Sequence, residues 1–87
     1  MNLTDILKKL PDEPGVYLYY SVTKELIYVG KATSLKSRVK SYFSGKRTSR
    51  PIEQMMHQVV EIKWEVTDSV LEAVILESVY IKKEKFC

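Results

Sequence analysis

GVYLYY at residues 15–20 and LIYVG at residues 26–30 determine the fold of this 87-residue chain. Both stretches are rich in β-branched and aromatic residues, and a short polar connection separates them. This pattern is typical of two antiparallel strands joined by a tight hairpin loop. The hairpin is therefore the element from which the rest of the fold is predicted.

The number of residues in the hairpin loop decides which side chains face each other. If that number is even, Tyr19 lies opposite Tyr28 and Tyr17 lies opposite Gly30, and opposite residues share a face of the sheet. The three tyrosines then stand together, with Lys31 directly after the second strand. The other face is expected to carry Val16, Leu18, Ile27 and Val29. A simpler alternative is a ladder of tyrosine rings that only covers the sheet.

The remaining periodicities predict four helices and a third strand around this hairpin. Leu3, Ile6, Leu7 and Leu10 recur at helical spacing before Pro11, and Ile62, Trp64 and Val66 alternate with charged residues. A second helix is expected from a cap at Thr33 or Ser34 to about Phe43. A third begins at Pro51 and carries an apolar stripe that ends at Val59 and Val60. The last covers about 70–85, where Ser69 and Glu72 form a capping-box pattern. The order α-β-β-α-α-β-α predicts an α+β fold, a small three-stranded antiparallel sheet surrounded by helices.

Length and composition indicate one domain, residues 1–87, with 45% hydrophobic and 29% charged residues. No apolar stretch approaches the roughly 18 to 20 residues that span a bilayer, so no membrane association is expected. The only cysteine is Cys87, which excludes an internal disulfide and favours a reducing, cytoplasmic location.

The charge is distributed unevenly. Between Leu26 and Ile52 there is no acidic residue, and half of the 14 basic residues fall in this segment. They are Lys31, Lys36, Arg38, Lys40, Lys46, Arg47 and Arg50. All 11 acidic residues lie elsewhere, so the segment indicates contact with a polyanion such as DNA. A solvated, basic surface is the alternative.

Glu77 and Arg38 occupy unusual places in their predicted helices. Glu77 is flanked at helical spacing by Val70, Ala73, Tyr80 and Ile81. A carboxylate in an apolar sector needs a metal, a cation or a proton to compensate its charge. The alternatives are a metal site, a pairing with a nearby lysine, and exposure of the helix to solvent at this position. Arg38 lies at the border of its helix's apolar stripe, where a guanidinium can hold a phosphate with two hydrogen bonds.

Together these residues resemble the GIY-YIG endonuclease family over nearly the whole chain, with Val in place of Ile in both tripeptides. Within the family, the chain is most similar to the N-terminal domain of the bacterial excinuclease UvrC. The matching segments are Gly15-Val16-Tyr17-Leu18, Ile27 to Ala32 with Leu35 and Arg38, Thr67-Asp68-Ser69, Glu72 to Glu77, and Ile81-Lys82.

The resemblance implies a three-stranded sheet and a metal-dependent nuclease. It assigns one divalent ion, Mg²⁺ or Mn²⁺, to Glu77, and the phosphate to Arg38. Tyr17 and Tyr28 would lie at the attacking water, with Tyr28 favoured as general base. Lys31 would hold the phosphate or ease tyrosine deprotonation. A free tyrosine has a pKa near 10, which Lys31, Arg38 and a metal are expected to lower.

The resemblance also implies a role in nucleotide excision repair, as the domain that makes the 3′-side incision beside a UvrB-like partner. An isolated domain is expected to be monomeric. Ser78-Val79 departs from the family, which commonly has two asparagines after this glutamate. The alternatives are a non-catalytic, basic nucleic-acid-binding module, a homing or other GIY-YIG nuclease, and a protein-interaction domain.

Overall fold

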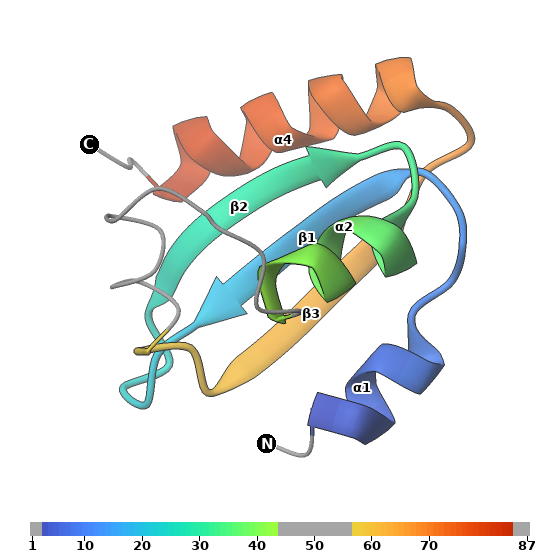
Figure 1. Ribbon diagram of the computed structural model, residues 1–87. Coiled ribbons are helices and arrows are strands. Elements are labelled where there is room, and N and C mark those ends of the chain that lie inside the picture. Colours follow the sequence, from blue (N-terminus) through green and yellow to red (C-terminus); the bar gives the residue numbers. More distant parts are fainter. Residues whose placement is uncertain (1–2, 44–56, 85–87) are drawn as a thin grey trace.

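The computed structural model describes residues 3–43 and 57–84. Its elements follow in the order α1 (Leu3–Lys9), β1 (Gly15–Tyr20), β2 (Leu26–Ala32), α2 (Leu35–Phe43), β3 (Glu61–Val66) and α4 (Val70–Glu84). The strands form one antiparallel sheet in the order β2-β1-β3, with β1 in the centre (Figure 1). The predicted α+β architecture is therefore confirmed.

The hairpin has the predicted pairing, but its loop, residues 21–25, holds an odd number of residues, so the expectation of an even loop was wrong. Tyr17 pairs with Gly30 and Tyr19 with Tyr28. A bulge follows, because Tyr20 pairs with Leu26. The bulge leaves Ile27 without its own partner, and this side chain packs with the tyrosines. The prediction that Ile27 faces the opposite side was therefore wrong.

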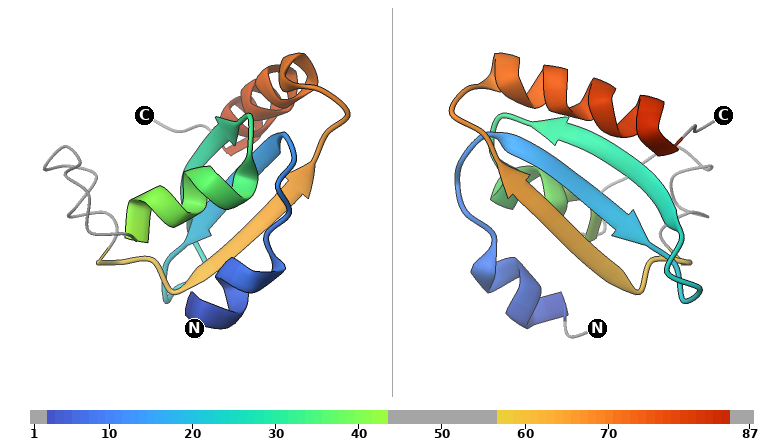
Figure 2. Two further views of the ribbon diagram at one scale, coloured as in Figure 1. Left: turned by 45° about the vertical axis from the view of Figure 1, so that its right-hand side comes forward. Right: turned by 180° about the vertical axis from the view of Figure 1, so that it is seen from behind.

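Helices cover both faces of the sheet (Figure 2). On one face, α1 and α2 enclose a core that contains Tyr17, Tyr19 and Ile62. On the other face, Leu76 and Tyr80 of α4 pack against a second cluster, which consists of Val16, Leu18 and Val29. α4 runs along β2, the strand at the sheet edge, and its outer side exposes apolar residues such as Leu71. Within the described residues, no helix has the length and apolar content needed to cross a membrane.

Serine caps begin two of the helices where the sequence predicts. The Ser34 hydroxyl accepts a hydrogen bond from the Ser37 amide at 3.2 Å, and Ser69 does the same for the Glu72 amide at 3.2 Å. The Glu72 carboxylate accepts from the Asp68 amide at 3.1 Å, one residue before the position that a capping box uses.

The segment before β3 departs from the prediction. Most of the helix predicted from Pro51 lies outside the described residues, but its expected end at Val59 and Val60 is not helical. Val59 is buried in the core, and the Val60 amide donates to the Tyr20 carbonyl at 2.9 Å, so the chain already runs beside the sheet. In β3, Trp64 packs inward as predicted. Val66 is 43% exposed because its partner, Gly15, has no side chain to cover it.

Candidate active site

Four tyrosines from three elements meet on the α2 face of the sheet. Tyr17 and Tyr19 come from β1, Tyr28 from β2 and Tyr42 from α2. The ring of Tyr17 lies 6.1 Å from that of Tyr28 and 5.8 Å from that of Tyr42, between centroids. The hydroxyls of Tyr17 and Tyr42 share a hydrogen bond of 3.0 Å. The predicted grouping of three tyrosines is confirmed, and a fourth joins it.

Gly30 makes room for this cluster. A Cβ atom built on Gly30 would overlap the end of the Tyr17 ring and its hydroxyl. Because Tyr17 is only 1% exposed, the surrounding core leaves no space into which its ring could move. Gly15 has a different function, since a Cβ there would collide with the backbone carbonyl of Glu65. Both glycines therefore permit close packing in the sheet.

Burial dominates the acidity of the phenols. It raises the pKa of Tyr17, Tyr19 and Tyr28 above the ordinary value near 10, and the neighbouring phenol of Tyr42 raises all three pKa values further. The Arg38 charge lowers the pKa of Tyr19, but less than burial raises it. Desolvation thus outweighs the nearby cations of the described residues. That Lys31, Arg38 and a metal together lower a tyrosine pKa stays a prediction.

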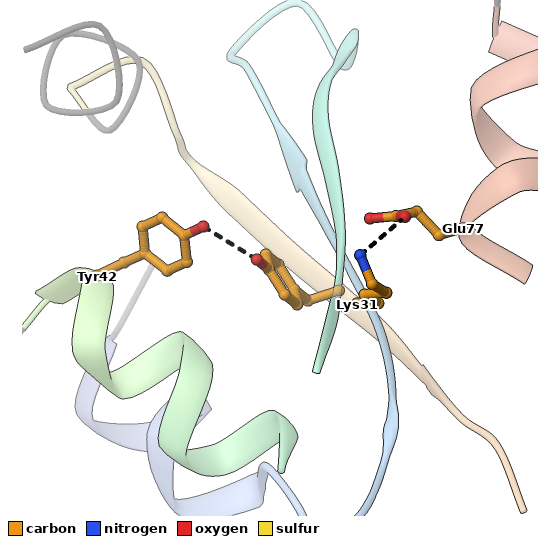
Figure 3. A network of polar contacts seen from close by, with 4 residues as sticks. Lys31, Tyr42 and Glu77 are labelled. Carbon is orange, nitrogen blue, oxygen red and sulfur yellow. Dashed lines mark hydrogen bonds and ion pairs between the residues drawn. The ribbon is translucent and has the colours of Figure 1, made fainter. Parts of the chain in front are cut away.

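Lys31 and Glu77 lie on the other face of the sheet. Lys31 follows Gly30 in β2 and so points away from the tyrosines, toward α4. Its Nζ is 3.6 Å from a Glu77 carboxylate oxygen (Figure 3). The Glu77 side chain is 21% exposed and that of Lys31 is 48% exposed. Lys31 thus supplies the charge compensation that the position of Glu77 in α4 requires.

A cleft joins the end of β2 to α2 and to the start of α4. It has a volume of about 440 Å³, and its lining includes the side chains of Lys31, Arg38 and Val70. Thr33, Ser37 and Ser41 also line it. Two cations and three hydroxyls at one open surface can bind a phosphodiester.

The predicted site residues thus form two groups at the edge strand β2. Tyr17, Tyr28 and Gly30 lie together on one side, and Lys31 and Glu77 pair on the other. Electrostatic contact links the groups, because the Glu77 charge contributes to raising the pKa of Tyr28. Arg38 lies on α2, at the cleft that it shares with Lys31. No direct contact between Glu77 and Arg38 is present in the described part of the chain.

Sequence reasoning missed Tyr42 as a site residue. Its place on the inward stripe of the helix at 35–43 indicated a core residue, and this is where its ring lies. The sequence does not show that the hydroxyl of this ring contacts the hydroxyl of Tyr17. Only the docking of α2 on the sheet reveals that contact. Lys46, Arg47 and Arg50 lie outside the described residues.

The donor set is compatible with a lightly coordinated divalent ion. No group of three or more His, Cys, Asp or Glu side chains forms a metal cage among residues 3–43 and 57–84. Glu77 is a single accessible carboxylate that already attracts the ammonium group of Lys31. Magnesium keeps several waters and is commonly held by one or two carboxylates together with substrate phosphate. Glu77 therefore fits such an ion better than it fits zinc, which prefers a closed set of protein ligands.

Comparison with known proteins identifies the family of this chain. The family described as UvrC-like GIY-YIG domain matches residues 13–86. The chain belongs to this family. UvrABC system protein C from Symbiobacterium thermophilum is 46% identical over 86 residues, which cover 98% of this chain and 14% of that protein. The same protein from Clostridium acetobutylicum is 49% identical over 80 residues, 91% of this chain and 13% of that protein. The chain therefore spans about one seventh of these relatives.

Solved structures share the fold of this chain. The GIY-YIG N-terminal endonuclease domain of UvrC from Thermotoga maritima, bound to magnesium as its catalytic divalent cation, is similar with a TM-score of 0.82 and 30% identity. The match covers 98% of this chain and 94% of that one. The expectation of a UvrC-like GIY-YIG nuclease domain is confirmed.

Proposed function

We propose that this domain is a divalent-metal-dependent DNA endonuclease that makes the 3′-side incision of nucleotide excision repair. The observation that carries the proposal is the cleft at β2, which brings the cations Lys31 and Arg38 to one surface, with Lys31 paired to Glu77. Positioning and charge stabilisation are the main requirements for hydrolysing a phosphodiester. The similarity to a UvrC endonuclease domain with a bound catalytic cation supports the same activity.

Glu77 would hold the divalent ion, Mg²⁺ or Mn²⁺. Such an ion supplies Lewis-acid stabilisation of negative charge on phosphate oxygens and acidifies bound water. Lys31 neutralises Glu77 in the present structure. Because the Lys31 side chain is 48% exposed, it can also turn toward a phosphate in the cleft. Arg38 would grip the phosphate from the α2 side of the cleft.

Tyr28 is the best candidate for the general base. It is partly exposed, whereas Tyr17 is buried and its hydroxyl is engaged by Tyr42. The raised pKa of Tyr28 keeps it neutral at pH 7. To act as the base, Tyr28 must first lose its own proton to solvent, a step that a bound cation would favour. The resulting phenolate then takes the proton of the attacking water. Tyr17 and Tyr42 hold Tyr28 in position through ring packing.

Lys31, Lys36, Arg38 and Lys40 would bind the DNA backbone, which carries little sequence information. Lys46, Arg47 and Arg50 belong to the same proposal but lie outside the described residues. The proposed setting is a cytoplasmic repair complex with a UvrB-like partner, and the isolated chain, residues 1–87, is proposed to be a monomeric single domain.

Replacing Glu77 tests the proposal. Glu77→Gln keeps the side chain's size but removes the charge that would hold the ion. We expect single-turnover cleavage of a nicked duplex in Mg²⁺ to fall about 100-fold or more, because a bound metal contributes several kcal/mol of charge stabilisation. Mn²⁺ affinity, followed by electron paramagnetic resonance, should fall with it. Glu61→Gln, at the exposed start of β3, is the matched control. Undiminished cleavage by Glu77→Gln would exclude the assigned metal site.

One observation favours a second candidate, a non-catalytic nucleic-acid-binding module. Lys31 already compensates Glu77, so a metal is not needed to keep that carboxylate charged. This alternative predicts salt-sensitive DNA binding that neither Mg²⁺ nor Mn²⁺ converts into cleavage. Metal-dependent nicking that disappears in Glu77→Gln would exclude it.

A further inference from the structure

The two flanks of α2 carry different polar side chains. Ser37, Arg38 and Ser41 line the cleft at β2. Lys36 and Lys40, one turn apart, line a separate groove of about 260 Å³ on the flank toward α1. Residues three or four apart share a helix face, which explains why each set stays together. The helix therefore separates two cationic surfaces.

The second surface is assembled by the tertiary structure. Lys8 of α1 lines it together with Lys36 and Lys40, and Thr4 and Leu7 complete its lining. None of these five side chains is acidic. All three lysines are exposed, and none forms an ion pair with a carboxylate of the described residues. We call this surface the α1–α2 lysine groove.

Three ammonium groups line this groove, and their mutual repulsion lowers the stability of the fold. Like charges at positions i and i+4 of a helix, as in Lys36 and Lys40, repel by a few tenths of a kcal/mol. Lys8 adds a third charge from a neighbouring helix. A polyanion that lies across the groove would relieve this repulsion and release its own condensed counterions.

The charge on the rest of the molecule indicates from which side a polyanion approaches. β3 and α4 together carry five glutamates against three lysines, whereas α1 and α2 carry five basic side chains against one carboxylate, that of Asp5. Asp12 and Glu13 are exposed in the loop between α1 and β1. α1 and α2 pack on the opposite face of the sheet from α4 (Figure 2). DNA is therefore repelled by the β3–α4 side and attracted to the α1–α2 side.

We infer that the α1–α2 lysine groove binds the backbone of the uncut strand of a DNA duplex, while the cleft at β2 binds the cut strand. This inference rests on the proposed nuclease function. An α-helix with its side chains is about 10–12 Å across, and the major groove of B-DNA is about 12 Å wide. α2 can thus lie along the major groove with the phosphates of one strand on each flank. Lys8, which the basic segment of the sequence does not include, becomes a duplex-binding residue.

The experiment measures DNA affinity without metal, so that it does not depend on cleavage. Fluorescence anisotropy in EDTA, at a series of salt concentrations, compares a labelled duplex with a single strand of the same length. The test protein carries Lys8→Gln, Lys36→Gln and Lys40→Gln. The control carries Lys63→Gln, Lys82→Gln and Lys83→Gln, which remove the same charge from β3 and α4.

For the duplex, the slope of log K against log[salt] should become shallower by up to about 2.7 in the test protein, since each phosphate contact contributes about 0.9. The control should keep the wild-type slope, and single-strand binding should change little in either protein. Equal slopes in test and control proteins, or no duplex binding by the wild type at low salt, would overturn the inference. An equal loss for single strand and duplex would also overturn it, because both surfaces would then hold the same strand. A shallower slope without any metal-dependent cleavage would leave the groove in place and reject the nuclease.

Discussion

Gly30→Ala is the sharpest test of how the tyrosine cluster is packed. An added methyl group would overlap the end of the Tyr17 ring, and that ring is enclosed by the rings of Tyr19, Tyr28 and Tyr42. Overpacking of this kind costs about 1–3 kcal/mol. Replacing a strand glycine by alanine returns about 0.5–1 kcal/mol of backbone entropy.

Displacement of Tyr17 also breaks its hydrogen bond to Tyr42, which contributes about 1 kcal/mol. The sum is a net loss of about 2 kcal/mol in the free energy of unfolding. For a domain of this size, each kcal/mol corresponds to about 4–8 °C, so the melting temperature should fall by about 8–16 °C. Urea denaturation and thermal melts followed by circular dichroism measure both quantities.

A double-mutant cycle assigns the cost to the ring. In a Tyr17→Leu background the overlap is gone, so Gly30→Ala should be neutral or slightly stabilising. The coupling energy should then be about 2 kcal/mol, within the range for residues in contact. Gly15→Ala is the control, because its collision is with the Glu65 backbone and should persist in that background. An equal cost of Gly30→Ala in both backgrounds would refute the reasoning.

Three further predictions concern pH and metal. The raised pKa values of Tyr17, Tyr19 and Tyr28 mean that the folded state holds protons which the unfolded state loses near pH 10. The contribution of these three phenols to stability should therefore stay constant below about pH 9 and fall above pH 10, by up to about 4 kcal/mol per pH unit; urea titrations that show no alkaline loss would contradict this. If Tyr28 is the base, the log of the single-turnover cleavage rate should rise with pH through neutrality, with a slope of about 1, whereas a plateau below pH 7 would indicate a carboxylate. EDTA should stop cleavage but leave duplex affinity unchanged, and added Mg²⁺ should restore cleavage; nicking that continues in EDTA would rule out a metal-dependent reaction.

Much of the fold could be predicted because its determinants are local. Alternation over two residues defines the strands and which side chains share a face. The pairing of Tyr19 with Tyr28 was predicted, although a bulge and not an even loop produces it. Ser34 and Ser69 cap the helices that follow them. The family could likewise be inferred from short segments and their order. These features depend on neighbours in the chain, so the sequence alone contains them.

The tertiary structure decided which of these elements meet. The hydroxyl bond of Tyr42 to Tyr17 depends on how α2 docks on the sheet. The pairing of Lys31 with Glu77 depends on α4 covering the face away from the tyrosines, and the approach of Lys8 to Lys36 depends on how α1 packs beside α2. Periodicity specifies which side of an element is apolar, but not which partner covers it. Those contacts are determined by the packing of the whole core, which no single segment encodes.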